Sequence, residues 1–325
     1  MQTAATFFIT TARSGTQWLV ETLATIYPDL LVVEHEPIGY AYSPKVYLRN
    51  PAALTDLRAR PVVREHFDRI HGVLRQKSYV EVGFPSFAAA PLLRAEFGER
   101  LRLVQLVRHP MRVAVSVAAQ QWFDPGRPKI LKDIAPAPTD PGVYLRHYGA
   151  RWATMTPFEK SLFYWAEVHL YGLEVRRELP EIPFLQLTFE DLLTGTPAQE
   201  RLAAFLDVPY RPAWREASAI RVDANPMDIN TVDRSQLQDH PEIASLARHF
   251  GYDIGDADIG YTPVGDSDIG DTRFNRIADI WLSPRQRLRW RRLRKVGATL
   301  MRVLDAIFLG DIVRSVRRVA KTRLR

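Results

Sequence analysis

The segment that most constrains the fold lies at residues 6–18 and reads Thr-Phe-Phe-Ile-Thr-Thr-Ala-Arg-Ser-Gly-Thr-Gln-Trp. An apolar run leads into a short polar turn at Gly15 and then into a stretch with helical character. Glycine lets the backbone approach a ligand closely, and the free amides at a helix N-terminus attract anions. The segment therefore predicts a buried strand, a phosphate-binding turn and a helix.

A second segment of the same kind occupies residues 101–120. Its apolar strand ends in a charged turn, and Pro110 suits the first turn of a helix. Val113, Val117 and Gln120 then follow at helical spacing. Arg108 and Ser116 lie eight residues apart, so an arginine in the turn and a serine two helical turns later are placed to flank one phosphate.

The first turn lacks the glycine and lysine of the nucleotide-kinase pattern GxxxxGK[ST], so an ATP-type loop is disfavoured. The turn instead resembles the 5'-phosphosulfate loop of sulfotransferases, and the second segment resembles their 3'-phosphate motif. The resemblance covers about residues 4–252. It implies the donor 3'-phosphoadenosine 5'-phosphosulfate, with adenine stacked on Trp18. The donor-binding residues that it implies are Arg13, Ser14, Gly15, Thr16, Gln17, Trp18, Arg108 and Ser116.

Strand and helix patterns alternate along this region, which predicts an α/β fold with a mostly parallel central sheet covered by helices on both faces. The resemblance implies the P-loop NTPase-like form of that fold found in sulfotransferases. Further strands are predicted at 30–33, 78–82 and 182–188. Helices are predicted at 17–27, within 51–76, and at 91–97, 158–179, 197–206 and 243–250.

Of the predicted roles, the sequence determines least clearly which residue is the base that takes the proton during sulfuryl transfer. Cytosolic sulfotransferases carry a histidine after the third strand, but the matching residue is Gly83. Glu36-Pro37, after the second strand, resembles the Glu-Pro of carbohydrate and some bacterial members, so the chain is closer to those types. In an extended segment Glu34 and Glu36 face one way and His35 the other, which leaves either Glu36 or His35 as the base.

Arg13 is predicted to contact the bridging and sulfuryl oxygens, where charge develops during transfer. The acceptor pocket is predicted from the loop at 37–49, the turn at 83–87 and the segment 123–157, which contains six prolines. Aromatic side chains in or beside these segments could line an apolar or sugar-binding cleft, or pack as a small core. They are Tyr40, Tyr42, Phe84, Phe87, Trp122, Phe123 and Tyr144.

The composition limits the possible chemistry and the expected cellular compartment. The chain has 325 residues, no cysteine and a formal net charge of +7. The absence of cysteine excludes disulfides and thiolate catalysis and suits a reducing compartment. The first predicted strand begins near residue 5, which leaves no room for a signal peptide, so a cytoplasmic location is expected.

The positive charge lies near the C-terminus. Residues 281–325 contain 14 Lys and Arg against Asp305 and Asp311, and apolar residues there recur at helical spacing. We therefore expect a sulfotransferase domain at 1–252, an acidic linker at 253–280 and a basic amphipathic extension at 281–325. The extension could bind an anionic membrane surface or dock on its own domain. Nucleic acid is not expected as a partner.

The sequence thus predicts an enzyme that moves a sulfuryl group to a hydroxyl of a lipid, carbohydrate or other small acceptor, without a metal. Two alternatives stay open at this point. One is a P-loop kinase-like enzyme that transfers phosphate from ATP, and the other is a non-catalytic nucleotide-binding membrane adaptor. The acceptor itself is not specified by the sequence.

Overall fold

The computed structural model describes residues 3–218, 234–237 and 239–252. These residues all belong to the first of the two units into which the chain divides, Met1–Asp256. The expectations for 253–280 and 281–325 lie outside the described residues.

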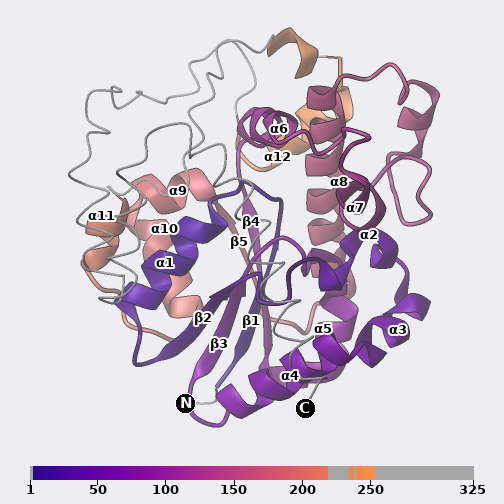
Figure 1. Ribbon diagram of the computed structural model, residues 1–325. Helices are drawn as coiled ribbons and strands as arrows, with labels where there is room; N and C mark the ends of the chain where they lie inside the picture. Colours follow the sequence, from indigo (N-terminus) through magenta and orange to yellow (C-terminus); the bar gives the residue numbers. More distant parts are fainter. Residues whose placement is uncertain (1–2, 219–233, 238, 253–325) are drawn as a thin grey trace, which may run out of the picture. The chain divides into compact units, whose positions relative to one another are not determined.

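Five parallel strands form one sheet, in the order β2-β3-β1-β4-β5 (Figure 1). The strand bounds are β1 Ala5–Thr10, β2 Leu31–His35, β3 Ser78–Val82, β4 Leu101–Val107 and β5 Phe184–Thr188. The predicted α/β class and parallel sheet are confirmed. Because all strands run the same way, the turns that follow β1, β2, β3 and β4 meet at one edge of the sheet, where open α/β sheets bind ligands.

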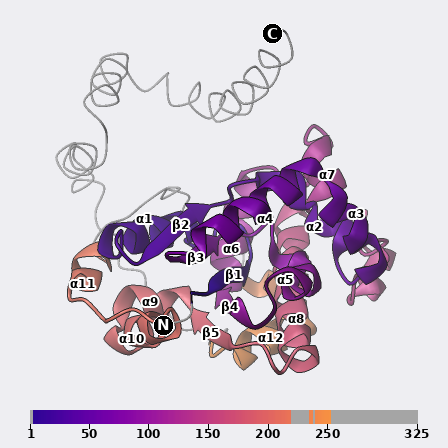
Figure 2. The ribbon, with the colours of Figure 1, turned by 90° about the horizontal axis from the view of Figure 1, so that it is seen from below.

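One face of the sheet is covered by the helices α1 (Thr16–Ile26), α9 (Phe189–Thr194), α10 (Thr196–Phe205) and α11 (Ala213–Ser218). They lie together on the left in Figure 1 and again in the view from below in Figure 2. A buried apolar cluster joins them to the strands, with Phe8, Val80 and Val104 on the sheet side and Leu19, Leu23 and Leu202 on the helices. This cluster fixes the position of α1, which directly follows the turn at Gly15.

The opposite face carries α4 (Pro61–Val73), α5 (Ala90–Phe97) and the long helix α8 (Pro157–Glu178). Phe7 of β1 packs there against Tyr79 of β3 and Phe97 of α5. Helix α8 begins with a capping box formed by Thr156 and Glu159. It packs closely along α6 (Pro110–Ala119), the helix that follows β4.

Several boundaries differ from the sequence-based expectation. The helical region predicted within 51–76 is divided into α3 (Leu54–Ala59) and α4, because Pro61 starts a new helix and disfavours a helical conformation at Arg60. The loop predicted at 123–157 contains a helix, α7 (Pro128–Asp133). Two further helices are α2 (Pro44–Tyr47) and α12 (Pro241–His249).

Candidate active site

The turn between β1 and α1 has a backbone conformation that requires glycine at position 15. Gly15 adopts a left-handed conformation with φ of 79°, and a Cβ at this position would overlap the ring of Phe189 from α9. Arg13 also has a positive φ, 65°. The Ser14 hydroxyl is buried and hydrogen-bonds the Thr11 hydroxyl at 2.7 Å. The first amides of α1 lack carbonyl partners within the helix, so they are available to an anion at this turn.

The turn between β4 and α6 contacts the first turn directly. Strands β1 and β4 are neighbours, so their carboxyl ends lie side by side. The Arg108 Nη1 donates to the Arg13 carbonyl oxygen at 2.6 Å, and the Arg13 Nε donates to the Ser116 Oγ at 2.8 Å. The structure therefore brings together the two predicted phosphate-binding segments, which are about one hundred residues apart in sequence.

Three elements distant in sequence hold this second turn in place. The Trp165 indole of α8 donates to the Arg108 carbonyl oxygen at 2.9 Å. The Glu190 carboxylate of α9 accepts from the His109 amide at 3.2 Å and from the Tyr252 hydroxyl at 2.8 Å. The Tyr252 hydroxyl also lies 3.2 Å from the Val107 carbonyl oxygen.

Positive charge is concentrated at these turns. The pKa of Arg108 is lowered to about 10, chiefly by burial; Glu190 opposes this change, and the nearby charges of Arg112 and Arg13 contribute to it. The Arg108 Nε is buried without a hydrogen-bond partner among the described residues. The three positive charges repel one another, and the Glu190 carboxylate offsets part of this repulsion at Arg108. The cluster of Arg13, Arg108 and Arg112 is therefore suited to bind a highly charged anion.

The end of β2 places both candidate bases at the same edge of the sheet. The His35 Nε2 lies 3.0 Å from the Thr16 Oγ1 and 3.5 Å from the Glu36 Oε1. The expectation that Glu36 and His35 face opposite ways is wrong, because the strand ends at His35 and Glu36 has a φ of 48°. Glu34 lies elsewhere, paired with Arg69 of α4.

The Glu36 carboxyl has the properties of a base that works near neutral pH. Burial raises its pKa to about 7, and the charge of Glu81 raises it too, whereas the Phe84 amide and Arg13 act in the opposite direction. Its side chain is 21% exposed, so it remains accessible. A Cβ on Gly83 would lie 2.5 Å from the Glu36 Cγ. Gly83 therefore provides the space that Glu36 occupies.

Two side chains predicted to bind the donor, Trp18 and Gln17, contact other groups of the protein in the structure. The Trp18 indole is 3% exposed, donates to the Ala217 carbonyl oxygen at 3.0 Å and packs edge-on against Phe189. Stacking a base on this ring would require α11 to shift. The Gln17 amide donates to the Glu21 carboxylate at 3.2 Å along α1. Their roles in donor binding stay predictions.

Four aromatic side chains pack in a row beside the turn at Arg13, and we define them as the aromatic wall: Tyr40, Phe84, Trp122 and Tyr164. Phe84, Trp122 and Tyr164 are buried, so these rings form part of the core. Successive ring centroids in this order are 6.3, 5.3 and 5.4 Å apart. The Tyr164 hydroxyl accepts from the Ala12 amide at 3.0 Å, which ties the wall to the turn that holds Arg13. The other predicted aromatic residues pack elsewhere, namely Tyr42 near His66, Phe87 near Tyr171, Phe123 near Trp152, and Tyr144 near Arg49.

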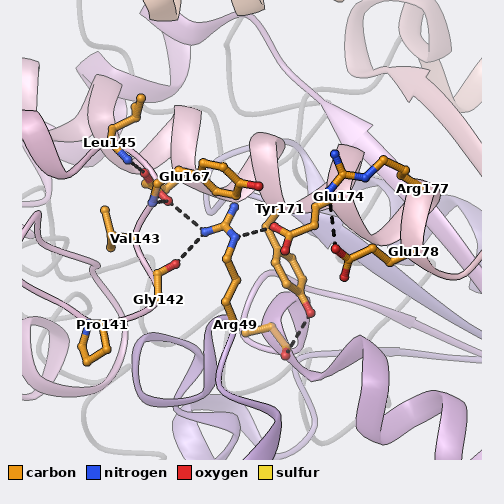
Figure 3. A network of polar contacts seen from close by, with 12 residues as sticks. Arg49, Pro141, Gly142, Val143, Leu145, Glu167, Tyr171, Glu174, Arg177 and Glu178 are labelled. Atoms are coloured by element: carbon orange, nitrogen blue, oxygen red, sulfur yellow. Dashed lines mark hydrogen bonds and ion pairs between the residues drawn. The ribbon is translucent and has the colours of Figure 1, made fainter.

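Arg49 joins two of the loops predicted to form the acceptor pocket to α8 (Figure 3). Its Nη1 donates to the Gly142 carbonyl oxygen at 2.7 Å and to the Glu167 carboxylate at 3.1 Å, and its Nε donates to Glu174. The buried Glu167 carboxylate also accepts from the amides of Tyr144 and Leu145. This network fixes the segment 123–157 against the loop at 37–49, and sequence reasoning missed it. A charged residue inside the apolar pattern of the predicted helix 158–179, Glu167, was the available signal.

Two further observations concern the described residues only. Within them, no group of three or more His, Cys, Asp or Glu side chains is arranged to hold a metal ion. None of the helices in this part of the chain has the length and apolar character needed to span a bilayer.

No family model matches the sequence, and a search of curated proteins also finds no match. Solved structures to which the chain is similar include three sulfotransferases or sulfotransferase domains. One belongs to the olefin synthase of Synechococcus PCC 7002, with 16% identity, a TM-score of 0.45, and coverage of 77% of this chain and 94% of that domain. Another comes from the curacin biosynthetic pathway, with 15% identity, a TM-score of 0.44, and coverage of 78% and 99%. A third is a sulfotransferase from Alicyclobacillus acidocaldarius, with 18% identity, a TM-score of 0.44, and coverage of 78% and 98%.

Proposed function

We propose that the chain is a sulfotransferase that takes its sulfuryl group from 3'-phosphoadenosine 5'-phosphosulfate and passes it to a hydroxyl. One observation carries the proposal. The turn at Arg13 to Gly15 and the turn at Arg108 touch through the Arg108 contact to the Arg13 carbonyl oxygen, and Ser116 joins them. A donor with phosphate at both its 5' and 3' positions suits a cationic site built from two such adjoining turns, whereas ATP has no 3' phosphate.

The arginine cluster stabilises the charge that transfer produces. In the reaction, the bond between sulfur and the bridging phosphate oxygen breaks, and its electron pair leaves with adenosine 3',5'-bisphosphate. A new bond forms between sulfur and the acceptor oxygen, whose proton passes to a base. Arg13 and the first amides of α1 are assigned to the leaving oxygen, because preorganised donors at developing charge give large rate effects. Arg108 and Ser116 are assigned to the 3' phosphate.

Glu36 is our choice of base. Its pKa of about 7 leaves roughly half of the carboxyl ionised at neutral pH, which is the range where general bases are most effective. His35 is the alternative, and its contact with the Thr16 hydroxyl suggests instead that it orients the first turn of α1. The space at Gly83 favours Glu36, since a histidine side chain at that position would overlap it.

Binding and turnover test the proposal separately. Titration with adenosine 3',5'-bisphosphate and with ATP plus magnesium should show clearly tighter binding of the bisphosphate. Incubation with the ³⁵S-labelled donor and an extract of the host should then yield a labelled product with the natural chain and none with Glu36→Gln. Equal affinity for ATP, or full turnover by Glu36→Gln, would contradict the assignment. Glu99→Gln, an exposed substitution of the same type, serves as the control.

A further inference from the structure

A buried network joins helix α4 and the loop at 37–49 to strand β3. The Glu81 carboxylate of β3 lies at its centre and is fully buried. Its Oε2 accepts from the His66 Nε2 of α4 at 2.8 Å and from the Tyr42 hydroxyl of the loop at 3.4 Å, and it lies 3.2 Å from the Tyr79 hydroxyl. A buried carboxylate needs such donors, because burying an unpaired charge is costly.

The hydrogen bonds of His66 fix which of its ring nitrogens carries the proton. The Arg69 Nη2 lies 3.0 Å from the His66 Nδ1, and a guanidinium group can only donate. The Nδ1 is therefore an acceptor, so the proton is on the Nε2, which donates to Glu81. A side chain without a donor at position 66 would leave the Glu81 carboxylate with one hydrogen bond fewer.

The network holds the chain on both sides of Glu36. On the N-terminal side, the Glu34 carboxylate lies 2.7 Å from the Tyr79 hydroxyl. On the C-terminal side, Tyr42 is joined to Glu81. The backbone at Glu36 itself has a φ of 48°, a conformation that residues other than glycine adopt mainly where surrounding contacts impose it. The contacts of Glu34 and Tyr42 are placed to impose it.

This backbone conformation determines where the Glu36 carboxyl lies. The side chain occupies the space beside Gly83, where a Cβ would come within 2.5 Å of the Glu36 Cγ. A change of backbone at residue 36 would carry the carboxyl away from this place. The ionisable groups that interact with the carboxyl here come from five segments, and they are His35 at the end of β2, Glu81 of β3, Arg13 of the first turn, Tyr40 of the following loop and Tyr164 of α8.

We propose that the buried pair of His66 and Glu81 positions Glu36 for proton transfer. Neither member of the pair is assigned to the reacting atoms, and both act through the backbone of residues 34–42. Their role rests on the proposed function, to which it adds a positioning pair outside the candidate active site. Packing alone would not require a histidine and a carboxylate here, because apolar side chains of similar size can replace a buried pair without loss of stability.

Two substitutions of His66 test the pair, and a third variant is the control. His66→Leu has a similar volume and no donor for Glu81, whereas the amide of His66→Gln can donate in place of the His66 Nε2. The matched control is His71→Leu. His71 lies on the same helix, and its Nε2 is 2.9 Å from the Glu96 carboxylate of α5, which is also paired with Arg58.

Each variant is examined with and without turnover. NMR of protein labelled with ¹³C at the glutamate carboxyls follows the ionisation of Glu36, and the Glu36→Gln variant identifies its signal. Transfer is measured with saturating ³⁵S-labelled donor and an extract of the host. Binding of adenosine 3',5'-bisphosphate is measured by titration calorimetry, which separates a defect in positioning from a defect in the donor site.

In the natural chain, Glu36 should titrate with a midpoint of about 7. His66→Leu should move this midpoint toward 4.5, the value of an ordinary glutamate, because a released side chain is more exposed to water. Its transfer rate should fall about 10- to 100-fold, as expected for a displacement of about 1 Å, with bisphosphate affinity unchanged. His66→Gln should recover most of the rate and the midpoint, and His71→Leu should retain both.

An unmoved midpoint in His66→Leu, an equal shift in His71→Leu, or no recovery in His66→Gln would overturn the inference. If His66→Leu does not fold, Tyr42→Phe replaces it, because this change removes only the hydroxyl that joins the loop to Glu81. It should move the midpoint in the same direction, and an unmoved midpoint would again overturn the inference. The expected shifts without any labelled product from the natural chain would support the positioning pair and count against sulfuryl transfer.

Discussion

Replacing Glu36 with glutamine should make the protein more stable and inactive at the same time. The pKa of the Glu36 carboxyl is about 7 in the fold, against 4.5 for an ordinary glutamate. An acid with a raised pKa holds its proton more tightly when folded, so its ionised form costs stability. The difference between these pKa values corresponds to about 3.4 kcal/mol of unfolding free energy at alkaline pH. Screening by water at this partly exposed side chain leaves about 2 to 3 kcal/mol.

The sign of the effect sets its pH dependence. Below about pH 4.5 the carboxyl is protonated in both states and contributes no cost. Stability is lost as the pH rises from 4.5 to about 7, and above 7 the full cost is present. Glu36→Gln has no charge to ionise and keeps an oxygen that can accept from the Phe84 amide. It should therefore exceed the natural chain in stability at pH 8 and not at pH 4.

Thermal unfolding measured at pH 4, 6 and 8 checks this expectation. At pH 8 the Glu36→Gln variant should unfold roughly 5 to 10 °C higher, given about 2 to 4 °C per kcal/mol for a domain of this size. The natural chain should show an acid limb in kcat/KM with a midpoint near pH 7, and the variant should lose about 10² or more in kcat. The same gain in Tm at all three pH values would refute the reasoning, as would an unchanged kcat.

Three other substitutions test separate parts of the site. Gly83→Ala places a methyl group 2.5 Å from the Glu36 Cγ. The value of kcat should therefore fall about tenfold or more, while titration shows unchanged binding of adenosine 3',5'-bisphosphate. Normal turnover by this variant would contradict the role of Gly83 in making room for Glu36. Ser116→Ala removes the partner of the Arg13 Nε and should weaken bisphosphate binding about five- to tenfold, whereas unchanged affinity would exclude Ser116 from the donor site. Arg49→Lys loses the planar guanidinium that pairs with the buried Glu167 carboxylate. The unfolding free energy measured in urea should fall by about 2 to 4 kcal/mol. An unaltered urea midpoint would show that the Arg49 network does not hold the loops predicted to form the acceptor pocket.

The sheet and the two turns could be predicted from the sequence because their signals are local. A buried strand followed by a glycine turn or by proline at a first helical turn is visible within about twenty residues, as at Gly15 and Pro110. Parallel pairing of β1 with β4 then brings the turns together without further information. Arg13, Arg108 and Ser116 meet for this reason.

The orientation of Glu36 could not be predicted from alternation along a strand. Its left-handed backbone depends on where β2 ends, and the room for its side chain depends on Gly83 of a neighbouring strand end. The contacts of Arg49 are equally non-local, since they join residues 93 to 125 positions apart in the sequence. Such features arise from tertiary packing, for which a single sequence has no short-range signal.

The anchoring of the second turn by Glu190 and Tyr252 has a consequence for biosynthesis. A ribosome releases the chain from the N-terminus, so β1 and the turn at Gly15 emerge early. Glu190 and Tyr252, which brace the turn at Arg108, emerge 175 and 237 residues after Gly15. A nascent chain that ends before Tyr252 lacks one of these braces, and one that ends before Phe189 also lacks the ring that packs on Gly15. Affinity for the proposed nucleotide donor should therefore arise late in synthesis.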